Sequence, residues 1–177
     1  MDWTDRSTCV LFGDGAGAAV LSASEEDGIL SMVQGSDGFR GDVLNCMARK
    51  VNNPYKKSDT ALSYVSMNGQ EVYRFAVKTV PKAVTDAVEQ AGLQLEEIDL
   101  FLLHQANYRI IEAVSKRLGQ PMEKFPTNLE ECGNISAASV PILLDNVNNH
   151  GMMRKGMKIV LAGFGAGLTW GATVINW

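Results

Sequence analysis

The chain has 177 residues, enough for one ordinary domain with a buried core. Hydrophobic residues make up 46% and charged residues 20%, proportions that exclude an intrinsically disordered protein. The net charge of −4 gives no indication of a nucleic-acid-binding surface, and no run of about 18 apolar residues predicts a membrane span. We therefore expect a globular protein with neither nucleic-acid nor membrane partners.

The three cysteines, Cys9, Cys46 and Cys132, are odd in number and widely spaced. No CxxC pair or histidine-rich cluster accompanies them, so the sequence predicts neither a zinc site nor a disulfide framework. The first six residues are polar, unlike a signal or transit peptide. These features favour a reduced, cytoplasmic setting and no bound metal.

The glycine-rich beginning of the chain is predicted to form two buried strands. The apolar runs Cys9–Phe12 and Ala18–Leu21 flank Gly13–Gly17, which suits a tight hairpin between them. Gly13–Ala18 also fits a loose form of the dinucleotide-binding fingerprint. That fingerprint must open a helix, whereas here a strand-like run follows, so the hairpin is the favoured interpretation.

The middle of the chain combines a strand, a long loop and a long helix. Ile29–Val33 is a predicted strand, and residues 37–63 are polar and irregular, typical of a surface loop that carries function. Apolar residues recur at helical spacing over Gly69–Ala91, which predicts a helix. Pro81 is expected to kink or interrupt it.

Strands and helices alternate in the remaining sequence, which indicates an α/β layered sheet. The predicted elements are a strand at Ile98–Leu103, a helix at Tyr108–Leu118, an extended piece at Phe125–Asn128, a helix at Ser136–Asn149, a strand at Lys158–Ala162, a turn at Gly163–Gly167 and a strand at Thr169–Trp177. The hairpin-like ends of the chain imply that the sheet is mixed, with helices covering it. No repeat or linker divides the chain.

Three loops of small residues point to a functional site. His104 follows a buried strand, where open α/β sheets place their ligands, although position alone favours a structural histidine. Asn134 precedes a helix that begins with small residues, and Phe164–Gly167 offers backbone N–H groups in a tight turn. Three such loops together suit a narrow acyl-transfer pocket.

Four motifs resemble those of β-ketoacyl-acyl-carrier-protein synthase III. In chain order they are Phe12–Ala19, His104–Asn107, Gly133–Pro141 and Phe164–Gly171. The resemblance runs through the whole chain and implies a thiolase fold, which is built of two similar halves. Residues 1–177 resemble only the C-terminal half, so we expect one thiolase-fold domain with the N-terminal half absent.

The resemblance also implies a reaction. In this family a cysteine of the N-terminal half accepts a short acyl group, such as acetyl, from coenzyme A. Malonyl-acyl-carrier-protein then loses carbon dioxide, and its carbanion attacks the acyl-cysteine to initiate fatty acid biosynthesis. None of the three cysteines here lies in the nucleophile motif, so an acyltransferase half that is inactive alone is implied.

The same resemblance implies no cofactor beyond the thioester substrates. The implied partners are acyl carrier protein, a coenzyme A thioester, the N-terminal half and, in the full enzyme, a second copy in a homodimer. A half that normally packs against another half should expose an apolar patch.

The catalytic histidine and asparagine of the family match His104 and Asn134. Both would donate hydrogen bonds to the malonyl thioester oxygen as it becomes enolate-like, so the histidine should be neutral. Phe164 matches a phenylalanine near the nucleophile, and the Ala166 N–H matches a donor of a second oxyanion hole. Because alanine replaces the usual glycine there, the turn must avoid a positive φ.

Two further groups of residues are candidates for binding the substrate arm and the carrier protein. The residues that match the pantetheine channel are Gly69, Gln70, Tyr73 and Arg109. Arg109 and Lys116 share one face of their predicted helix. The residues predicted to form a docking patch for the acidic carrier protein and for phosphate are Arg109, Lys116 and Arg117, with Arg74 as an extension. The alternative for the second group is a solvated basic face.

Two other functions stay open. One is a ketosynthase III-like enzyme of a specialised pathway, because the absent half and the dimer partner largely set the choice of acyl starter. The other is a non-catalytic half that binds carrier protein or pairs with a separate chain. An upstream coding sequence of roughly 170–180 residues with a nucleophile cysteine would favour a catalytic enzyme, since the two halves are domains of similar size.

Overall fold

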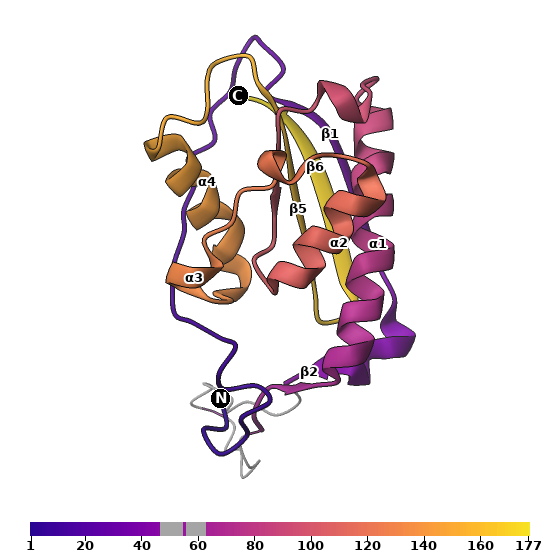
Figure 1. The fold of residues 1–177 in the computed structure, drawn as a ribbon, viewed down its shortest axis with the longest axis vertical. Coiled ribbons are helices and arrows are strands. Elements are labelled where there is room, and N and C mark those ends of the chain that lie inside the picture. Colours follow the sequence, from indigo (N-terminus) through magenta and orange to yellow (C-terminus); the bar gives the residue numbers. More distant parts are fainter. Residues whose placement is uncertain (47–54, 56–62) are drawn as a thin grey trace.

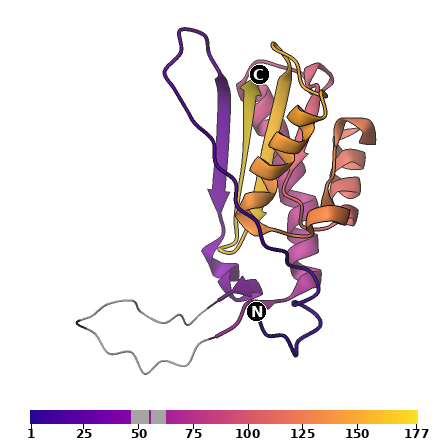
Figure 2. The same ribbon diagram turned by 90° about the vertical axis from the view of Figure 1, so that its left-hand side faces the viewer.

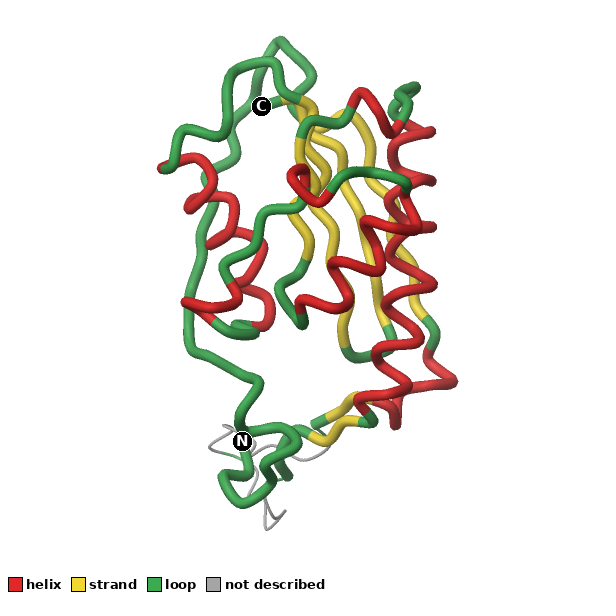
Figure 3. Tube along the Cα trace, in the orientation of Figure 1, coloured by secondary structure: helices red, strands yellow, loops and turns green. Residues whose placement is uncertain are grey.

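The computed structural model describes residues 1–46, Tyr55 and residues 63–177 (Figures 1 and 3). The strands are β1 (Ile29–Ser36), β2 (Leu44–Asn45), β3 (Ser66–Met67), β4 (Leu100–Leu103), β5 (Lys158–Gly165) and β6 (Thr169–Asn176). The α-helices are α1 (Gly69–Gln90), α2 (Tyr108–Leu118), α3 (Leu129–Cys132) and α4 (Ser139–Asn149). Short 3-10 helices are η1 (Gly38–Val43), η2 (Leu95–Glu97), η3 (Met122–Lys124) and η4 (Ser136–Ala138).

The central sheet has the strand order β1-β6-β5-β4. β6 runs antiparallel to both β1 and β5, whereas β4 and β5 are parallel. The predicted mixed sheet is therefore confirmed. The predicted turn at Gly163–Gly167 is partly wrong, because Gly163–Gly165 continue β5 and pair with β6.

Helices cover both faces of this sheet. α1 and α2 lie on one side and α4 on the other, as Figures 1 and 2 show. Phe101 and Leu103 of β4 pack with α1 and α2, whereas Leu100 and Leu102 pack with Leu143 of α4. All four residues of β4 are buried for this reason, which is typical of a strand covered on both faces.

The long helix α1 follows its sequence prediction closely. The Asn68 side chain accepts a hydrogen bond from the Glu71 N–H and so caps the first turn. The apolar face, which includes Ala76 and Val84, packs in the core with residues of the sheet such as Val174. The helix runs through Pro81 without the predicted interruption, and its N-terminal and C-terminal parts form one element.

The two strands predicted near the N-terminus are wrong. Residues 13–28 form no strand, as Figure 3 shows, and Val20 and Leu21 are 97% and 83% exposed. A strand needs a neighbouring strand for its backbone hydrogen bonds. Among the described residues, the N-terminal segment pairs only at Phe12, just before this stretch, through a single bridge to Asn134. Two of its glycines instead lie against α4, where Gly15 approaches Ile142 and Gly17 approaches Pro141.

The predicted loop at 37–63 contains η1 and β2, and residues 47–54 and 56–62 lie outside the described residues. Among the described residues, no helix is both long enough and apolar enough to cross a membrane.

Candidate active site

His104 lies at the carboxyl end of β4. Its backbone N–H donates to the Ala162 carbonyl at 2.8 Å, which continues the parallel pairing of β4 with β5. The imidazole packs edge-on against the Phe164 ring, with the ring centres 5.3 Å apart. His104 therefore lies at the carboxyl ends of the parallel strands β4 and β5, which is where open α/β sheets bind their ligands.

The His104 imidazole is held neutral and tied at one nitrogen. Burial lowers its pKa to about 4, because the interior disfavours the charged form, and this agrees with the expected neutral donor. Nδ1 lies 2.6 Å from the Ser139 hydroxyl at the start of α4. Nε2 is therefore the ring nitrogen left for a ligand.

Asn134 is positioned by the N-terminal segment. Its N–H donates to the Leu11 carbonyl at 3.1 Å, and its carbonyl accepts from the Gly13 N–H at 2.9 Å. The side-chain oxygen accepts a hydrogen bond from the Ser136 N–H at 3.0 Å, and Ser136 adopts φ +52°. With the oxygen held in this way, the amide NH₂ is the group of Asn134 that can act on a ligand.

The turn between β5 and β6 contributes Ala166. The Thr169 hydroxyl donates to the Ala166 carbonyl at 2.9 Å, and Asp37 and Leu168 exchange two backbone hydrogen bonds beside it. Ala166 is exposed and keeps out of the positive-φ region, as expected for alanine at this place. These hydrogen bonds fix the turn. The Ala166 N–H can therefore donate a hydrogen bond to a ligand from a fixed position.

One cavity of about 1340 Å³ brings these elements together, a volume sufficient for a long flexible ligand. The predicted site residues that line it are His104, Asn134, Phe164, Ala166, Gly69, Tyr73 and Arg109. The predicted residues outside its lining are Gln70, Arg74, Lys116 and Arg117. The proposed catalytic pair and most of the proposed channel thus share one cavity, whereas most of the docking patch lies away from it.

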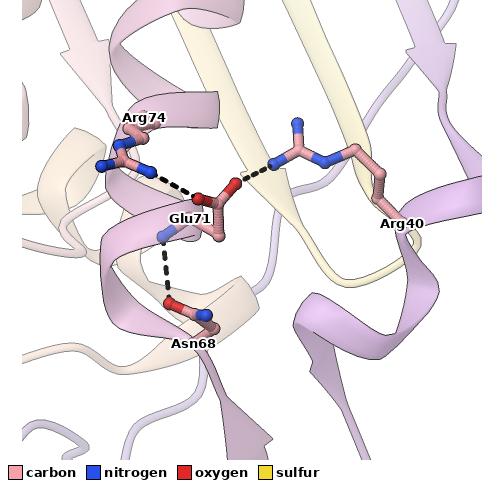
Figure 4. A network of polar contacts seen from close by, with 4 residues as sticks. All are labelled: Arg40, Asn68, Glu71 and Arg74. Atoms are coloured by element: carbon pink, nitrogen blue, oxygen red, sulfur yellow. Dashed lines mark hydrogen bonds and ion pairs between the residues drawn. The ribbon is translucent and has the colours of Figure 1, made fainter.

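A charged network fixes the start of α1 beside this cavity (Figure 4). Glu71 accepts from Arg40 at 3.0 Å and from Arg74 at 2.7 Å, so one carboxylate bridges two guanidinium groups. Arg40 also lies over the Phe75 ring, 6.0 Å from its centre. Because Arg40 belongs to η1, the network ties that segment to α1, while the Arg74–Glu71 pair is largely exposed and weak.

The basic residues on α2 differ in their partners. Lys116 pairs with Glu112 at 2.8 Å, and this hydrogen bond raises the pKa of Lys116. Arg109 and Arg117 take part in none of the ion pairs recorded for the described residues. Arg109 and Arg117 are therefore the residues of α2 whose positive charge no recorded ion pair neutralises.

Sequence reasoning missed one residue of the site. Ser139 belongs to the small residues that follow Asn134, and its buried hydroxyl contacts the His104 ring. The two residues are 35 positions apart, so no local spacing indicates the contact. Among the described residues no group of three or more His, Cys, Asp or Glu could hold a metal ion, and all three cysteines are free thiols.

Comparison with known proteins places the chain in a family. Residues 88–177, just over half of the chain, match the family model for the C-terminal part of 3-oxoacyl-[acyl-carrier-protein (ACP)] synthase III. Residues 1–38 match a second model, that of 3-oxoacyl-[acyl-carrier-protein (ACP)] synthase III.

Individual relatives agree with these matches. A β-ketoacyl-[acyl-carrier-protein] synthase III of Clostridium acetobutylicum is 48% identical over 178 residues, which cover 100% of this chain and 55% of that protein. The crystal structure of the 3-oxoacyl-[acyl-carrier-protein] synthase III from Aquifex aeolicus superposes with a TM-score of 0.88 at 38% identity, covering 99% of this chain and 53% of that one.

The priming β-ketosynthase from the R1128 polyketide biosynthetic pathway superposes with a TM-score of 0.89 at 37% identity and covers 99% of this chain and 53% of that one. The chain thus spans about half the length of the curated relatives it matches. Its mixed sheet and covering helices are the C-terminal part of a thiolase-like fold. The chain belongs to the 3-oxoacyl-[acyl-carrier-protein] synthase III family.

Proposed function

We propose that this chain is the C-terminal catalytic half of a β-ketoacyl-[acyl-carrier-protein] synthase III that condenses acetyl from coenzyme A with malonyl-carrier-protein. One observation carries the proposal. His104 and Asn134 line the same cavity, and a hydrogen bond occupies His104 Nδ1 and Asn134 Oδ1. The remaining group on each side chain, Nε2 and the NH₂, is then available to donate toward one substrate oxygen.

The proposed chemistry follows from these two donors. The bond between the malonyl carboxylate and its neighbouring carbon breaks, carbon dioxide leaves, and the electron pair forms a thioester enolate. His104 and Asn134 stabilise its oxygen, and fixed donors of this kind contribute roughly 3–4 kcal/mol each. The enolate carbon then attacks the acyl-cysteine carbonyl, a carbon–carbon bond forms, and the cysteine thiolate leaves.

Other residues would bind the acyl group and the pantetheine arm on either side of the reacting atoms. The Ala166 N–H would donate to the acyl-cysteine carbonyl oxygen, and Phe164 would shield the reacting atoms. The pantetheine arm would run past Gly69 and Tyr73 of α1 and leave beside Arg109 of α2. The acyl-accepting thiol would come from a part of the enzyme outside this sequence, so we expect the chain alone to release no condensation product.

The carrier protein is the proposed macromolecular partner. Carrier proteins are acidic, and Arg109 and Arg117 carry the positive charge that no recorded ion pair offsets. Arg74 and Lys116 each contact a glutamate and so contribute less. We therefore expect Arg109→Ala to weaken carrier-protein binding more than Lys116→Ala does.

The test is to mix this chain with the N-terminal half of the Clostridium acetobutylicum relative and measure carbon dioxide released from malonyl-carrier-protein. We expect His104→Ala and Asn134→Ala each to lower this rate roughly 10²–10³-fold. The matched control is His150→Ala, which removes the chain's other histidine, an exposed one. If activity survives loss of both His104 and Asn134 side chains, the assigned roles are wrong.

A second candidate is a priming ketosynthase of a specialised pathway. The specific observation in its favour is the R1128 enzyme, whose structure matches this chain as well as the Aquifex aeolicus enzyme does. Competition between acetyl-coenzyme A and longer acyl thioesters in the mixture would separate the two functions. No activity with any acyl donor, together with tight carrier-protein binding, would instead indicate a non-catalytic binding half.

A further inference from the structure

The contact between His104 and Ser139 joins two elements that the chain brings together from far apart. His104 Nδ1 lies 2.6 Å from Ser139 Oγ, and the hydroxyl belongs to the first residue of α4. The backbone N–H of Gln105 points to the same oxygen at 3.3 Å. Ser139 is fully buried, so bulk water does not reach its hydroxyl.

Ser139 is held in place by a rigid surrounding. Gln105 is also fully buried, and its side chain donates to the Leu103 carbonyl at 2.8 Å. The other end of the Gln105 amide accepts from the Asn128 N–H at 3.3 Å. The Gln105 N–H that donates to Ser139 is therefore fixed between β4 and α2. The Ser139 hydroxyl cannot rotate away from this N–H and from His104 Nδ1 without losing a hydrogen bond.

The hydrogen atoms in this contact can be counted. The Gln105 N–H can only donate, so it occupies one lone pair of Ser139 Oγ. If His104 Nδ1–H also donated to Oγ, the buried hydroxyl hydrogen would have no recorded acceptor among the described residues. If the hydroxyl donates to Nδ1 instead, every group is satisfied and the ring proton resides on Nε2. Leaving a buried hydroxyl unpaired shifts such an equilibrium by roughly 5- to 150-fold.

We propose that Ser139 is a positioning residue that holds His104 in the Nε2–H tautomer and so directs the imidazole donor into the cavity. The tautomer itself follows from the hydrogen-bond geometry alone. Its consequence for catalysis rests on the proposed function, because only an Nε2–H ring can donate to an enolate oxygen in the cavity.

A second histidine of the chain is predicted to have the opposite tautomer to His104. The chain contains two histidines, and the second, His150, is exposed at the C-terminal cap of α4. His150 Nδ1 lies 2.7 Å from the Asn146 carbonyl oxygen, which can only accept. The neutral form of His150 must therefore carry its proton on Nδ1. The two histidines of one chain are thus predicted to be opposite tautomers.

Nitrogen NMR of the full chain labelled with ¹⁵N-histidine tests the tautomers directly. For the neutral form of each ring we expect the Nε2–H pattern for His104 and the Nδ1–H pattern for His150. The Ser139→Ala variant should lower the preference of His104 for Nε2–H by at least about fivefold. The matched control is Ser115→Ala, which removes another buried serine whose hydroxyl donates to the Gln120 carbonyl at 2.7 Å, far from the ring.

The outcomes separate this inference from the proposed function. An Nδ1–H pattern for His104 in the unsubstituted chain, or an unchanged pattern in a folded Ser139→Ala variant, would overturn the role of Ser139. If Ser139→Ala does not fold, Ser139→Cys keeps a weaker donor of similar size and should show an intermediate tautomer ratio. The predicted tautomer with no decarboxylation in the mixed halves would leave the inference intact and reject the proposed function.

A catalytic readout supplements the spectrum. In the mixed halves, Ser139→Ala should lower kcat for decarboxylation in proportion to the fraction of His104 that remains in the Nε2–H tautomer, while leaving KM within about twofold, because substrate binding does not depend on the tautomer. Ser139→Cys should recover part of the rate. Ser115→Ala should leave both constants near those of the unsubstituted chain.

Discussion

Two regions of this chain have similar apolar sequences and opposite structural outcomes. Around β4, Leu102 lies between two helix layers and is fully buried. Near the N-terminus, the run Ala18–Leu21 is almost as apolar, yet Val20 and Leu21 are almost fully exposed. Burial depends on a partner surface as well as on the apolar residues themselves, and the described residues of this chain leave Val20 and Leu21 without such a surface.

The proposed active site lies between these two regions. His104 and Phe164 come from the sheet, whose strands and covering helices hold them. Asn134 is instead held by Leu11 and Gly13, which belong to the exposed N-terminal segment. We therefore expect the histidine side of the site to be fixed by this chain alone and the asparagine side to be the more easily displaced.

The largest contrast should come from the same substitution in both regions. Leu102→Ala removes a fully buried side chain and should lower the free energy of unfolding by about 2–5 kcal/mol. Leu21→Ala removes a side chain that is 83% exposed and should change it by less than about 0.5 kcal/mol. Urea unfolding of the two variants measures both. Similar losses would mean that the N-terminal run is packed as tightly as the sheet.

The next effect is a dependence of stability on pH that arises at His104. A free histidine has a pKa near 6.5, whereas burial lowers that of His104 to about 4 in the folded chain. Between these values the unfolded state binds more protons. The stability contribution is therefore complete above about pH 6.5 and is lost as the pH falls toward 4, by roughly 3 kcal/mol at most.

Unfolding of the unsubstituted chain and of His104→Gln, followed across this pH range, measures that contribution. The glutamine variant lacks the titrating ring, so the difference in unfolding free energy between the two proteins should change steadily between pH 6.5 and 4. A difference that is constant with pH would show that the ring is solvated in the folded chain.

The sequence predicts the sheet side of the site well because its elements are defined by local patterns. The helix Tyr108–Leu118 ends where expected, since Gly119 adopts the left-handed conformation with φ +65°. The strand before His104 is also recognisable from its continuous apolar residues. In each case the information lies within a few positions of the element itself.

The features that sequence reasoning missed depend on distant contacts. The hairpin predicted around Gly13–Gly17 needs a neighbouring edge strand, which nothing described in this chain supplies. The Ser139 contact with His104 joins α4 to β4, and Arg40 meets Glu71 across 31 positions. Side-chain pairs of this kind follow from how the layers stack, which a single sequence does not specify locally.

A smaller effect should follow from disturbing the junction between the two regions. A Cβ at Gly13 would collide with the Cys132 carbonyl oxygen, so Gly13→Ala must shift the backbone that holds Asn134. We expect a loss of about 1–2 kcal/mol in stability and roughly tenfold slower decarboxylation in the mixed halves. The control is Gly28→Ala in the same segment, where a Cβ meets nothing within 4 Å. Equal effects of the two alanines would contradict the anchoring role of Gly13.

The smallest effect on stability is expected where the N-terminal segment is most exposed. Val20→Ser combined with Leu21→Ser should leave the free energy of unfolding within about 0.5 kcal/mol, because neither side chain loses contacts within the chain. If the N-terminal half of a full-length relative covers this segment, the same double variant should bind that half at least about tenfold more weakly, since two apolar side chains no longer become buried on binding. The matched control is Phe39→Ser, which removes an exposed apolar side chain from η1, outside the segment. Titration of the labelled N-terminal half compares the three proteins. Equal weakening by Phe39→Ser would point to general adhesion of apolar residues, whereas a loss confined to the double variant would assign the exposed segment to the contact between halves.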